Sequence, residues 1–529
     1  MAKKLLIFMV ALGLIACTVA IKQEDSHFIK KGSLIYAEDN EAYFLYDVNL
    51  MTKKALEDYI DAIAHGHVTH FFMGVNGQRT NYRTKVSEAM WDPLKNDKVF
   101  PDVAWTKATR TLYEKGIDPY ATWIAKCRQV GISPWVEMRV NDQHFANVAN
   151  THKTRARILD FWRDHPEYRR TNRQGRKWSD YAFDYSQKAV RDYKLALVRE
   201  FLEFWDVDGV SIDWMRTTLN LPEGKEVENA HFITEFMVEV KKMADEWSKK
   251  RGHKIGVAVR VPICPKISRQ VGLNADEWAK MGLIDVLITS QSYQTHFDMR
   301  IEEWREAIGD AQKHVSIVAA TDHGFNPYPC GELWDSPRGR RTSMSMPYSL
   351  AWADNCYADG ADGLYIYNMM YSRDAWYKIA EEGLSKNKIR RSTRCYPISY
   401  IDNDILFGDV GKDFPDTDTQ LPRITGKDPV ELKIKVGTPP RKADVSVILG
   451  FEKADNLADA KFTATLNGVE STSYTHIFLR EWADWYGKAG AALAFKFPAE
   501  AVKKGYNTFK ISTDAKTKII YTELKVKPQ

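Results

Sequence analysis

The sequence is poor in cysteine, with six among 529 residues. Cys17 lies near the N-terminus, and the cysteines that follow it are an odd number spread far apart along the chain. This distribution excludes a full disulfide framework and lacks the spacing of metal ligands. We expect most of the later cysteines to be buried, inert thiols. They are Cys127, Cys264, Cys330, Cys356 and Cys395.

The chain also lacks an excess of charge of one sign. Its 75 basic and 70 acidic residues give a net charge of +5, which argues against nucleic-acid binding. It contains neither a glycine loop that would cradle a phosphate nor a serine nucleophile elbow. Aromatic residues are plentiful, with 16 Trp, 25 Tyr and 23 Phe, which suits stacking on sugar rings. The length predicts two or three domains.

Long hydrophobic runs are missing except at the N-terminus. Leu5–Ala16 is apolar and follows Lys3 and Lys4, but it is too short for a permanent membrane helix. We interpret residues 1–21 as a secretory signal and expect the protein to be exported. The stretch ending at Cys17 is similar to a lipobox, so a lipid anchor on Cys17 is favoured over cleavage after Ala20. Contact with a membrane is expected only through that anchor, at the outer-membrane surface or in the periplasm.

The stretch around which the chain is organised is Asp206–Arg216, a short apolar strand that ends in polar residues. It is one of eight apolar strands that alternate with amphipathic helices, the first of which is capped by Thr52. This alternation predicts a closed (β/α)8 barrel over residues 40–390. The expected strands are Tyr43–Val48, Val68–Val75, Ile132–Val140, Val210–Asp213, Lys254–Val261, Ile284–Thr289, Val315–Ala320 and Gly363–Tyr367.

A different pattern follows the barrel. Residues 391–427 are expected to be a linker, and residues 428–529 a small antiparallel β-sandwich. Its strands include Glu431–Val436, Asp444–Leu449 and Lys518–Val526. Trp482, Trp485 and Tyr486 cluster between predicted strands, where they can stack on sugars or, as we favour, pack against the neighbouring domain.

Polar residues gather where the predicted barrel strands end. In a (β/α)8 barrel these ends form the active-site face, so the residues should converge on one mouth. Asp213 is the principal candidate, although a simple ion pair that closes the strand is the alternative. The complete set of expected catalytic and substrate-binding residues is Asn76, Arg79, Glu137, Arg139, Asn141, Asp142, Asp213, Trp214, Arg216, Arg260, Tyr293, Asp322, His323 and Asn368.

Several carboxylates in this set suggest glycoside hydrolysis, which needs one ionised and one protonated carboxyl group. Asp213 is the expected nucleophile, with Asp322 as the first and Glu137 as the second candidate for the acid/base. Glu137 has an alternative role as a buried partner of Arg139 or Arg260. We expect Asp213 to share a solvent-exposed hollow, flanked by arginines, with a second carboxyl group.

The arginines of the set have two interpretations. Guanidinium groups suit bidentate recognition of carboxylate or sulfate groups, which predicts an acidic or sulfated glycan. Arginines that only neutralise the catalytic carboxylates are the alternative. No metal or other cofactor is expected: His65, His67 and His70 resemble zinc ligands, but they precede or begin a strand and so lie on the opposite face of the barrel.

Two longer stretches carry a family resemblance. Phe183–Tyr193 with Val207–Asp213, together with His165–Tyr168 and Arg139–Asp142, resembles secreted bacterial glycosyl-hydrolase-like barrels over Leu45–Ile379. The resemblance implies a (β/α)8 glycosidase fold with Asp213 as a catalytic carboxylate. The end of strand six, Ser290–Gln294, departs from the pattern because it carries no carboxylate.

These observations together predict a glycoside hydrolase that acts on a polysaccharide or oligosaccharide, with retention through Asp213. The alternative function is a non-catalytic, glycan-binding surface lipoprotein, because a fold does not guarantee activity.

Overall fold

The computed structural model describes most of the two predicted domains. The described residues are 27–39, 43–45, 47–93, 104–143, 146, 158–171, 178–291, 294–327, 342–367, 373–400, 420–453, 457, 459–477 and 489–529. The predicted signal, Cys17 and the cluster of Trp482, Trp485 and Tyr486 therefore lie outside them. No helix within these ranges is long and apolar enough to cross a membrane.

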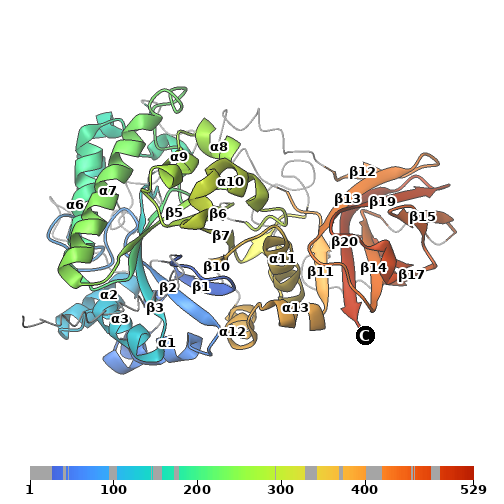
Figure 1. Cartoon of the computed structure of the whole chain (residues 1–529), viewed down its shortest axis with the longest axis horizontal. Coiled ribbons are helices and arrows are strands. Elements are labelled where there is room, and N and C mark those ends of the chain that lie inside the picture. Colours follow the sequence, from blue (N-terminus) through green and yellow to red (C-terminus); the bar gives the residue numbers. More distant parts are fainter. Residues whose placement is uncertain are drawn as a thin grey trace, which may run out of the picture.

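Eight parallel strands close into a barrel, as predicted (Figure 1). Their order around the barrel is β1-β10-β7-β6-β5-β4-β3-β2. Seven of the eight predicted strands lie within two residues of their observed bounds. The barrel strands are β1 (Ser33–Glu38), β2 (Val68–Gly74), β3 (Ser133–Arg139), β4 (Gly209–Asp213), β5 (Gly256–Pro262), β6 (Val286–Ser290), β7 (Ser316–Thr321) and β10 (Gly363–Tyr367).

Helices cover the outside of the barrel (Figure 1). Thr52 caps the first of them, because its Oγ1 accepts a hydrogen bond of 3.1 Å from the Ala55 amide. Helix α2 lies between β2 and α3, in a segment for which no helix was predicted. The helices are α1 (Lys53–Ile63), α2 (Ala104–Glu114), α3 (Pro119–Val130), α5 (Asp160–Asp164), α6 (Lys188–Phe204), α7 (Ala230–Arg251), α8 (Pro265–Gln270), α9 (Ala275–Lys280), α10 (Ile301–Ile308), α11 (Met346–Ala358), α12 (Arg373–Glu382) and α13 (Lys386–Arg391).

The position predicted for the first strand was wrong. The segment that starts at Tyr43 forms a 3-10 turn, and the first strand lies upstream, at Ser33–Glu38. Tyr43 is buried among helices, with its ring centroid 5.2 Å from that of Trp123. The true strand is buried along its whole length, so it lacks the polar alternation that marks a half-exposed strand. The barrel therefore begins before residue 40.

The amino-terminal half of the barrel lumen is filled by side chains. The ring of Trp135 stacks on Phe72 with centroids 4.9 Å apart, and Phe28 packs edge-on against it from the N-terminal segment. Trp135 has room because the neighbouring strands carry glycine: a Cβ at Gly209 would lie 2.3 Å from the indole, and one at Gly256 2.6 Å. Apolar packing thus closes this half, and polar side chains occupy the carboxyl-terminal half.

The C-terminal domain is the predicted β-sandwich. One sheet has the order β11-β20-β14-β18-β17, with β12 also paired to β20, and the other has the order β13-β19-β15-β16. The strands are β11 (Arg394–Pro397), β12 (Arg423–Ile424), β13 (Val430–Val436), β14 (Ala443–Phe451), β15 (Phe462–Leu466), β16 (Val469–Glu470), β17 (Ser473–Ile477), β18 (Ala491–Phe497), β19 (Gly505–Thr513) and β20 (Lys518–Pro528).

The predicted linker, residues 391–427, is partly incorporated into this sandwich. Both β11 and β12 pair antiparallel with β20. Cys395 and Tyr396 are buried there, and burial of their side chains favours the strand over a free connection. Cys395 is also one of four cysteines that the structure describes as buried free thiols, with Cys127, Cys264 and Cys356, as expected.

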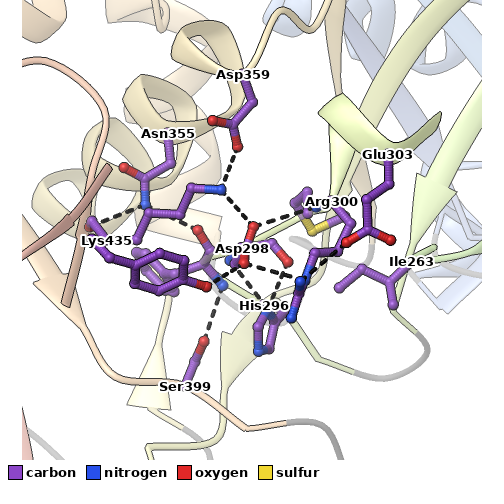
Figure 2. A network of polar contacts seen from close by, with 12 residues as sticks. Ile263, His296, Asp298, Arg300, Glu303, Asn355, Asp359, Ser399 and Lys435 are labelled. Carbon is purple, nitrogen blue, oxygen red and sulfur yellow. Dashed lines mark hydrogen bonds and ion pairs between the residues drawn. The ribbon is translucent and has the colours of Figure 1, made fainter. Parts of the chain in front are cut away.

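The two domains meet through a buried polar network (Figure 2). Lys435 of β13 donates from Nζ to Asp298, at 2.5 Å, and to Asp359, at 2.6 Å. Arg300 contacts the second oxygen of Asp298, with Nε 3.2 Å from Oδ2. A second group of contacts holds α11, where Asp354 accepts from Arg394 at 2.9 Å. The sandwich is therefore attached to the barrel by charges shielded from water.

We expect acid to weaken this interface through Asp298. Burial alone would raise the pKa of Asp298, but Lys435 and Arg300 outweigh it and lower the pKa from 3.8 to about 2. A lowered pKa means that the stabilisation is complete above the unfolded-state pKa and is lost as the pH falls toward about 2. In urea denaturation, wild type should therefore exceed Asp298→Asn in stability at neutral pH, and the difference should shrink below about pH 4. A difference that is constant with pH would contradict this assignment.

Candidate active site

Asp213 is the last residue of β4 and points into the barrel lumen. The strand register places Arg139 of β3 and Arg260 of β5 beside it. The Oδ1 atom accepts a hydrogen bond of 2.8 Å from the Met215 amide, and Oδ2 lies 3.4 Å from Nη1 of Arg260. Asp213 is 0% exposed. The expected arginine flank is thus present, but the expectation of a solvent-exposed hollow is not met.

Glu137 of β3 lies deeper in the lumen, beside Ser211. Its Oε2 accepts from the Ser211 hydroxyl at 2.8 Å, and its Oε1 accepts from the Tyr365 hydroxyl at 2.7 Å. Burial, followed by the negative charge of Asp213, raises the pKa of Glu137 to about 7. The adjacent strands therefore bring together two carboxyl groups, of which Glu137 retains its proton up to near neutral pH.

Arg260 links Asp213 to the opposite side of the lumen. Its Nε donates to the Ser290 hydroxyl at 2.9 Å. Its guanidinium lies over the ring of Tyr367, 4.3 Å from the centroid. These contacts fix the guanidinium in one orientation, which holds its positive charge beside Asp213.

Arg139 is the centre of a second ion-pair group at the same end of the barrel. It donates to Asp142 at 2.9 Å, to the Tyr367 hydroxyl at 2.6 Å, and to Asp39. Asp142 also lies 3.9 Å from Nε of Arg216. Arg139, Asp142 and Arg216 were all expected at the mouth, and the structure brings them together.

The side chains of Asn76 and Asn141 hold the loops around these ion pairs by hydrogen bonds to backbone groups. Asn76 accepts from the Arg139 amide at 3.1 Å and donates to the Arg139 carbonyl at 3.0 Å. Asn141 accepts from the Phe183 amide at 2.9 Å and donates to Asn220 at 2.6 Å. Both amides, expected to bind substrate, are thus occupied in holding the loops that follow β2 and β3.

Asp322 follows β7 on the same face as the lumen residues Val318 and Ala320. It is 1% exposed, and its Oδ1 accepts from the His323 amide at 2.7 Å and contacts the His323 ring. The Thr295 hydroxyl accepts a hydrogen bond from the Asp322 amide and donates one to the Asp322 carbonyl, each at 3.0 Å. The contacts described for Asp322 are therefore with His323 and with the segment between β6 and α10, whereas Glu137 lies close enough to Asp213 for that charge to raise its pKa.

Two expected substrate-binding residues are not brought to the mouth. Trp214 packs in the helical layer, with its ring centroid 5.2 Å from that of Tyr185, because strand alternation turns it away from the lumen that Asp213 faces. Arg79 is buried in a loop, where Nε donates to the Ile158 carbonyl at 3.0 Å and Nη2 lies 3.4 Å from Glu88. Tyr293 and Asn368 lie outside the described residues.

Sequence reasoning missed four residues of the site. Asp39 directly follows β1 and was missed because that strand was misplaced. Tyr365 and Tyr367 alternate on a strand whose bounds were correct, so their inward orientation could have been predicted. Lys194 of α6 could not have been found, because nothing in the local sequence distinguishes it from a surface lysine. It is buried, and burial lowers its pKa to about 8, although the charge of Asp142 acts in the opposite direction.

No group of three or more His, Cys, Asp or Glu among the described residues could hold a metal ion. His70 lies in the amino-terminal half of the barrel, beside Ser133 in the strand register. Burial lowers the pKa of His70 to about 4.

No protein-family model matches the chain, and a search of curated proteins finds no match. Among solved structures it is similar to alpha-L-fucosidase isoenzyme 2 from Paenibacillus thiaminolyticus, with a TM-score of 0.41 and 12% identity over 67% of this chain and 49% of that one. A cycloisomaltooligosaccharide glucanotransferase from Paenibacillus sp. gives a TM-score of 0.35 and 9% identity over 94% of this chain and 58% of that one. A GH36 alpha-galactosidase from Geobacillus stearothermophilus gives 0.35 and 10% over 92% and 56%. This chain spans about half the length of the first of these proteins and under two thirds of the others, and likenesses this weak carry no argument about its activity.

Proposed function

We propose that the protein is a glycoside hydrolase in which Asp213 and Glu137 are the catalytic carboxyl groups. One observation supports this most: two interacting carboxyl groups lie on adjacent strands of the barrel lumen, one ion-paired with Arg260 and one with its pKa raised to about 7. An ionised and a protonated carboxyl group are what hydrolysis of a glycosidic bond requires.

In the proposed reaction Asp213 attacks the anomeric carbon, and the bond from that carbon to the leaving oxygen breaks. Glu137 gives its proton to the leaving oxygen. Water then attacks the glycosyl–enzyme ester, Glu137 takes a proton from it, and Asp213 is released with net retention. Asp322 is the alternative partner of Asp213, at the end of a strand on the far side of the lumen.

The proposed substrate is a polysaccharide or oligosaccharide that carries carboxylate or sulfate groups. Arg139, Arg216 and Arg260 gather at one end of the barrel, where each lies beside a carboxylate. Guanidinium groups gathered in this way suit bidentate binding of an anionic group on the sugar. Neutralisation of the carboxylates remains the competing role of the arginines.

The burial of both carboxyl groups has a mechanistic consequence. Asp213 is 0% and Glu137 3% exposed, so a sugar can reach them only if residues around the mouth move. The same burial and ion pairing support a second candidate function, a non-catalytic glycan-binding protein in which the charges are structural. Turnover decides between them: wild type should release sugars from at least one anionic glycan that it binds, and binding without release from any of them would favour the second function.

Glu137→Gln should remove the alkaline limb of the pH profile. In wild type the rate should fall as the pH rises through about 7, because Glu137 loses the proton that it donates. The variant has no proton to give, so turnover should fall by about 10²- to 10⁴-fold and lose this limb. The matched control is Glu239→Gln, at a partly exposed residue of α7 on the outside of the barrel, which should keep both the rate and the limb. If the pH dependence of turnover is unchanged in Glu137→Gln, then Glu137 is not the acid and Asp322 is the remaining candidate.

Stability gives a second measurement of the same group. The raised pKa means that the folded protein binds the Glu137 proton more tightly than the unfolded chain, so the free energy of unfolding should decrease between about pH 4.5 and 7. Glu137→Gln should lack this decrease.

We also propose that the protein is exported and carries a lipid on Cys17. The apolar run Leu5–Ala16 and the stretch ending at Cys17 support this. Mass spectrometry of the mature N-terminus tests it, because cleavage after Ala20 without lipid would contradict it.

A further inference from the structure

The segment between β6 and α10 is held by the sandwich domain. The carboxylate of Asp298 accepts hydrogen bonds from the Lys435 ammonium of β13 and from the Tyr506 hydroxyl of β19. One residue earlier, the Phe297 amide donates to the Ser399 hydroxyl at 3.0 Å, just after β11. Figure 2 shows Lys435 of the sandwich and Arg300 of the barrel converging on Asp298.

The same segment holds the end of β7 on its other side. Thr295 is 0% exposed, and its hydroxyl lies 2.7 Å from that of Thr321, the last residue of β7. Its amide donates to the Gly324 carbonyl at 2.7 Å. The Thr295 hydroxyl also forms hydrogen bonds with both the amide and the carbonyl of Asp322. Thr295–Asp298 therefore joins the sandwich to the position of Asp322 and His323.

The contacts that run from Lys435 through Asp298 and Thr295 to Asp322 are largely buried, so a change at one end should affect the structure at the other. Asp298 and Thr295 are buried, and buried hydrogen bonds to charged groups are stronger than exposed ones. An aromatic contact runs parallel to them, since the rings of Phe297 and Phe325 lie 5.2 Å apart at 74°. A segment of four residues bonded at both ends has little freedom to move independently of either.

We propose that the sandwich is a positioning domain for the barrel mouth. Lys435, through Asp298, fixes Thr295, and Thr295 fixes the end of β7 that carries Asp322 and His323. Lys435 and Asp298 are positioning residues, because they contact neither Asp213 nor Glu137. The coupling stands on these contacts alone; only its consequence for turnover rests on the proposed function.

Other contacts between the domains provide controls. Lys504 donates to the Ala358 carbonyl at 3.0 Å, at the end of α11. Tyr396 donates from its hydroxyl to Asp354 of α11 at 2.5 Å. Neither contact involves Thr295–Asp298. Lys504→Met therefore repeats the substitution made at Lys435, and Tyr396→Phe removes a buried hydrogen bond from the same interface.

Hydrogen exchange of the full chain, followed by mass spectrometry, tests the coupling. In Lys435→Met, peptides that contain the amides of Thr295 and Asp322 should exchange about tenfold faster than in wild type, because these two amides donate the hydrogen bonds that join the segment to the end of β7. Asp298→Asn should give the same result, which keeps the test valid if one variant folds poorly. Lys435→Arg should restore slow exchange because it keeps the charge. Lys504→Met and Tyr396→Phe should leave these peptides unchanged.

Two results would overturn the proposal: slow exchange at these amides in Lys435→Met and Asp298→Asn, or equally fast exchange in Tyr396→Phe. Exchange decides the coupling whether or not wild type cleaves a glycan. Asp322 and His323 follow β7 at the active-site end of the barrel, so their displacement in Lys435→Met should misalign the bound sugar. On a glycan that wild type does cleave, this should lower kcat about tenfold and change KM less than twofold. An unchanged kcat with faster exchange would refute the positioning role while leaving the proposed hydrolase function intact.

Discussion

Asp213→Asn should lower glycan turnover by at least about 10³-fold while leaving glycan affinity within a few-fold of wild type. The amide is nearly the same size as the carboxylate, and it can still accept from the Met215 amide that now donates to Asp213 at 2.8 Å. It cannot form a stable ester with the anomeric carbon. Initial rates on an anionic glycan panel, with affinities from calorimetry, measure both quantities.

The control for this variant must account for Arg260. Removing the charge of Asp213 leaves that guanidinium buried beside a neutral group, which costs stability. Urea denaturation of the variant shows whether lost turnover merely reflects unfolding. Asp192→Asn, on the exposed side of α6, should change neither rate nor stability. A folded Asp213→Asn protein with wild-type turnover would exclude Asp213 from the chemistry.

Gly209→Ala should have the largest effect on stability. The new methyl carbon would lie 2.3 Å from the ring of Trp135, far inside van der Waals contact. Trp135 cannot move aside easily, because it stacks on Phe72 and its Nε1 donates to the Ser133 hydroxyl at 3.1 Å. Overpacking a core by a methyl group costs about 1–3 kcal/mol, and this closed lumen should place the loss at the upper end. Urea denaturation measures the loss.

Two further variants locate the cause. Gly426→Ala adds the same methyl group where no atom lies within 4 Å, so the stability should change by less than about 0.5 kcal/mol. Trp135→Phe in the Gly209→Ala background should recover part of the loss, because the smaller ring makes room. Equal stability of Gly209→Ala and wild type would show that the lumen is packed less tightly than the distances indicate.

Local patterns predicted most of the barrel. Strands such as Gly209–Asp213 are short runs between amphipathic helices, and parallel strands need such connections. The prediction of the first strand was wrong for two reasons. Ser33–Glu38 is buried on both faces and so shows no alternation, and the buried residues Tyr43 and Phe44, which pack against helices, form a similar apolar run. Periodicity cannot distinguish a buried strand from a buried turn.

The sequence by itself determined the closed barrel, the sandwich and the position of Asp213 at a strand end, because periodicity and strand termination are local properties. Only the tertiary structure decided which groups meet. Glu137 lies beside Asp213 because β3 and β4 are neighbours in register, and Trp214 is excluded because alternation turns it outward. The sandwich reaches the barrel mouth because Lys435 folds back onto Asp298, 137 residues earlier in the chain. Separations of that length leave no trace in local sequence, since they depend on how whole elements pack.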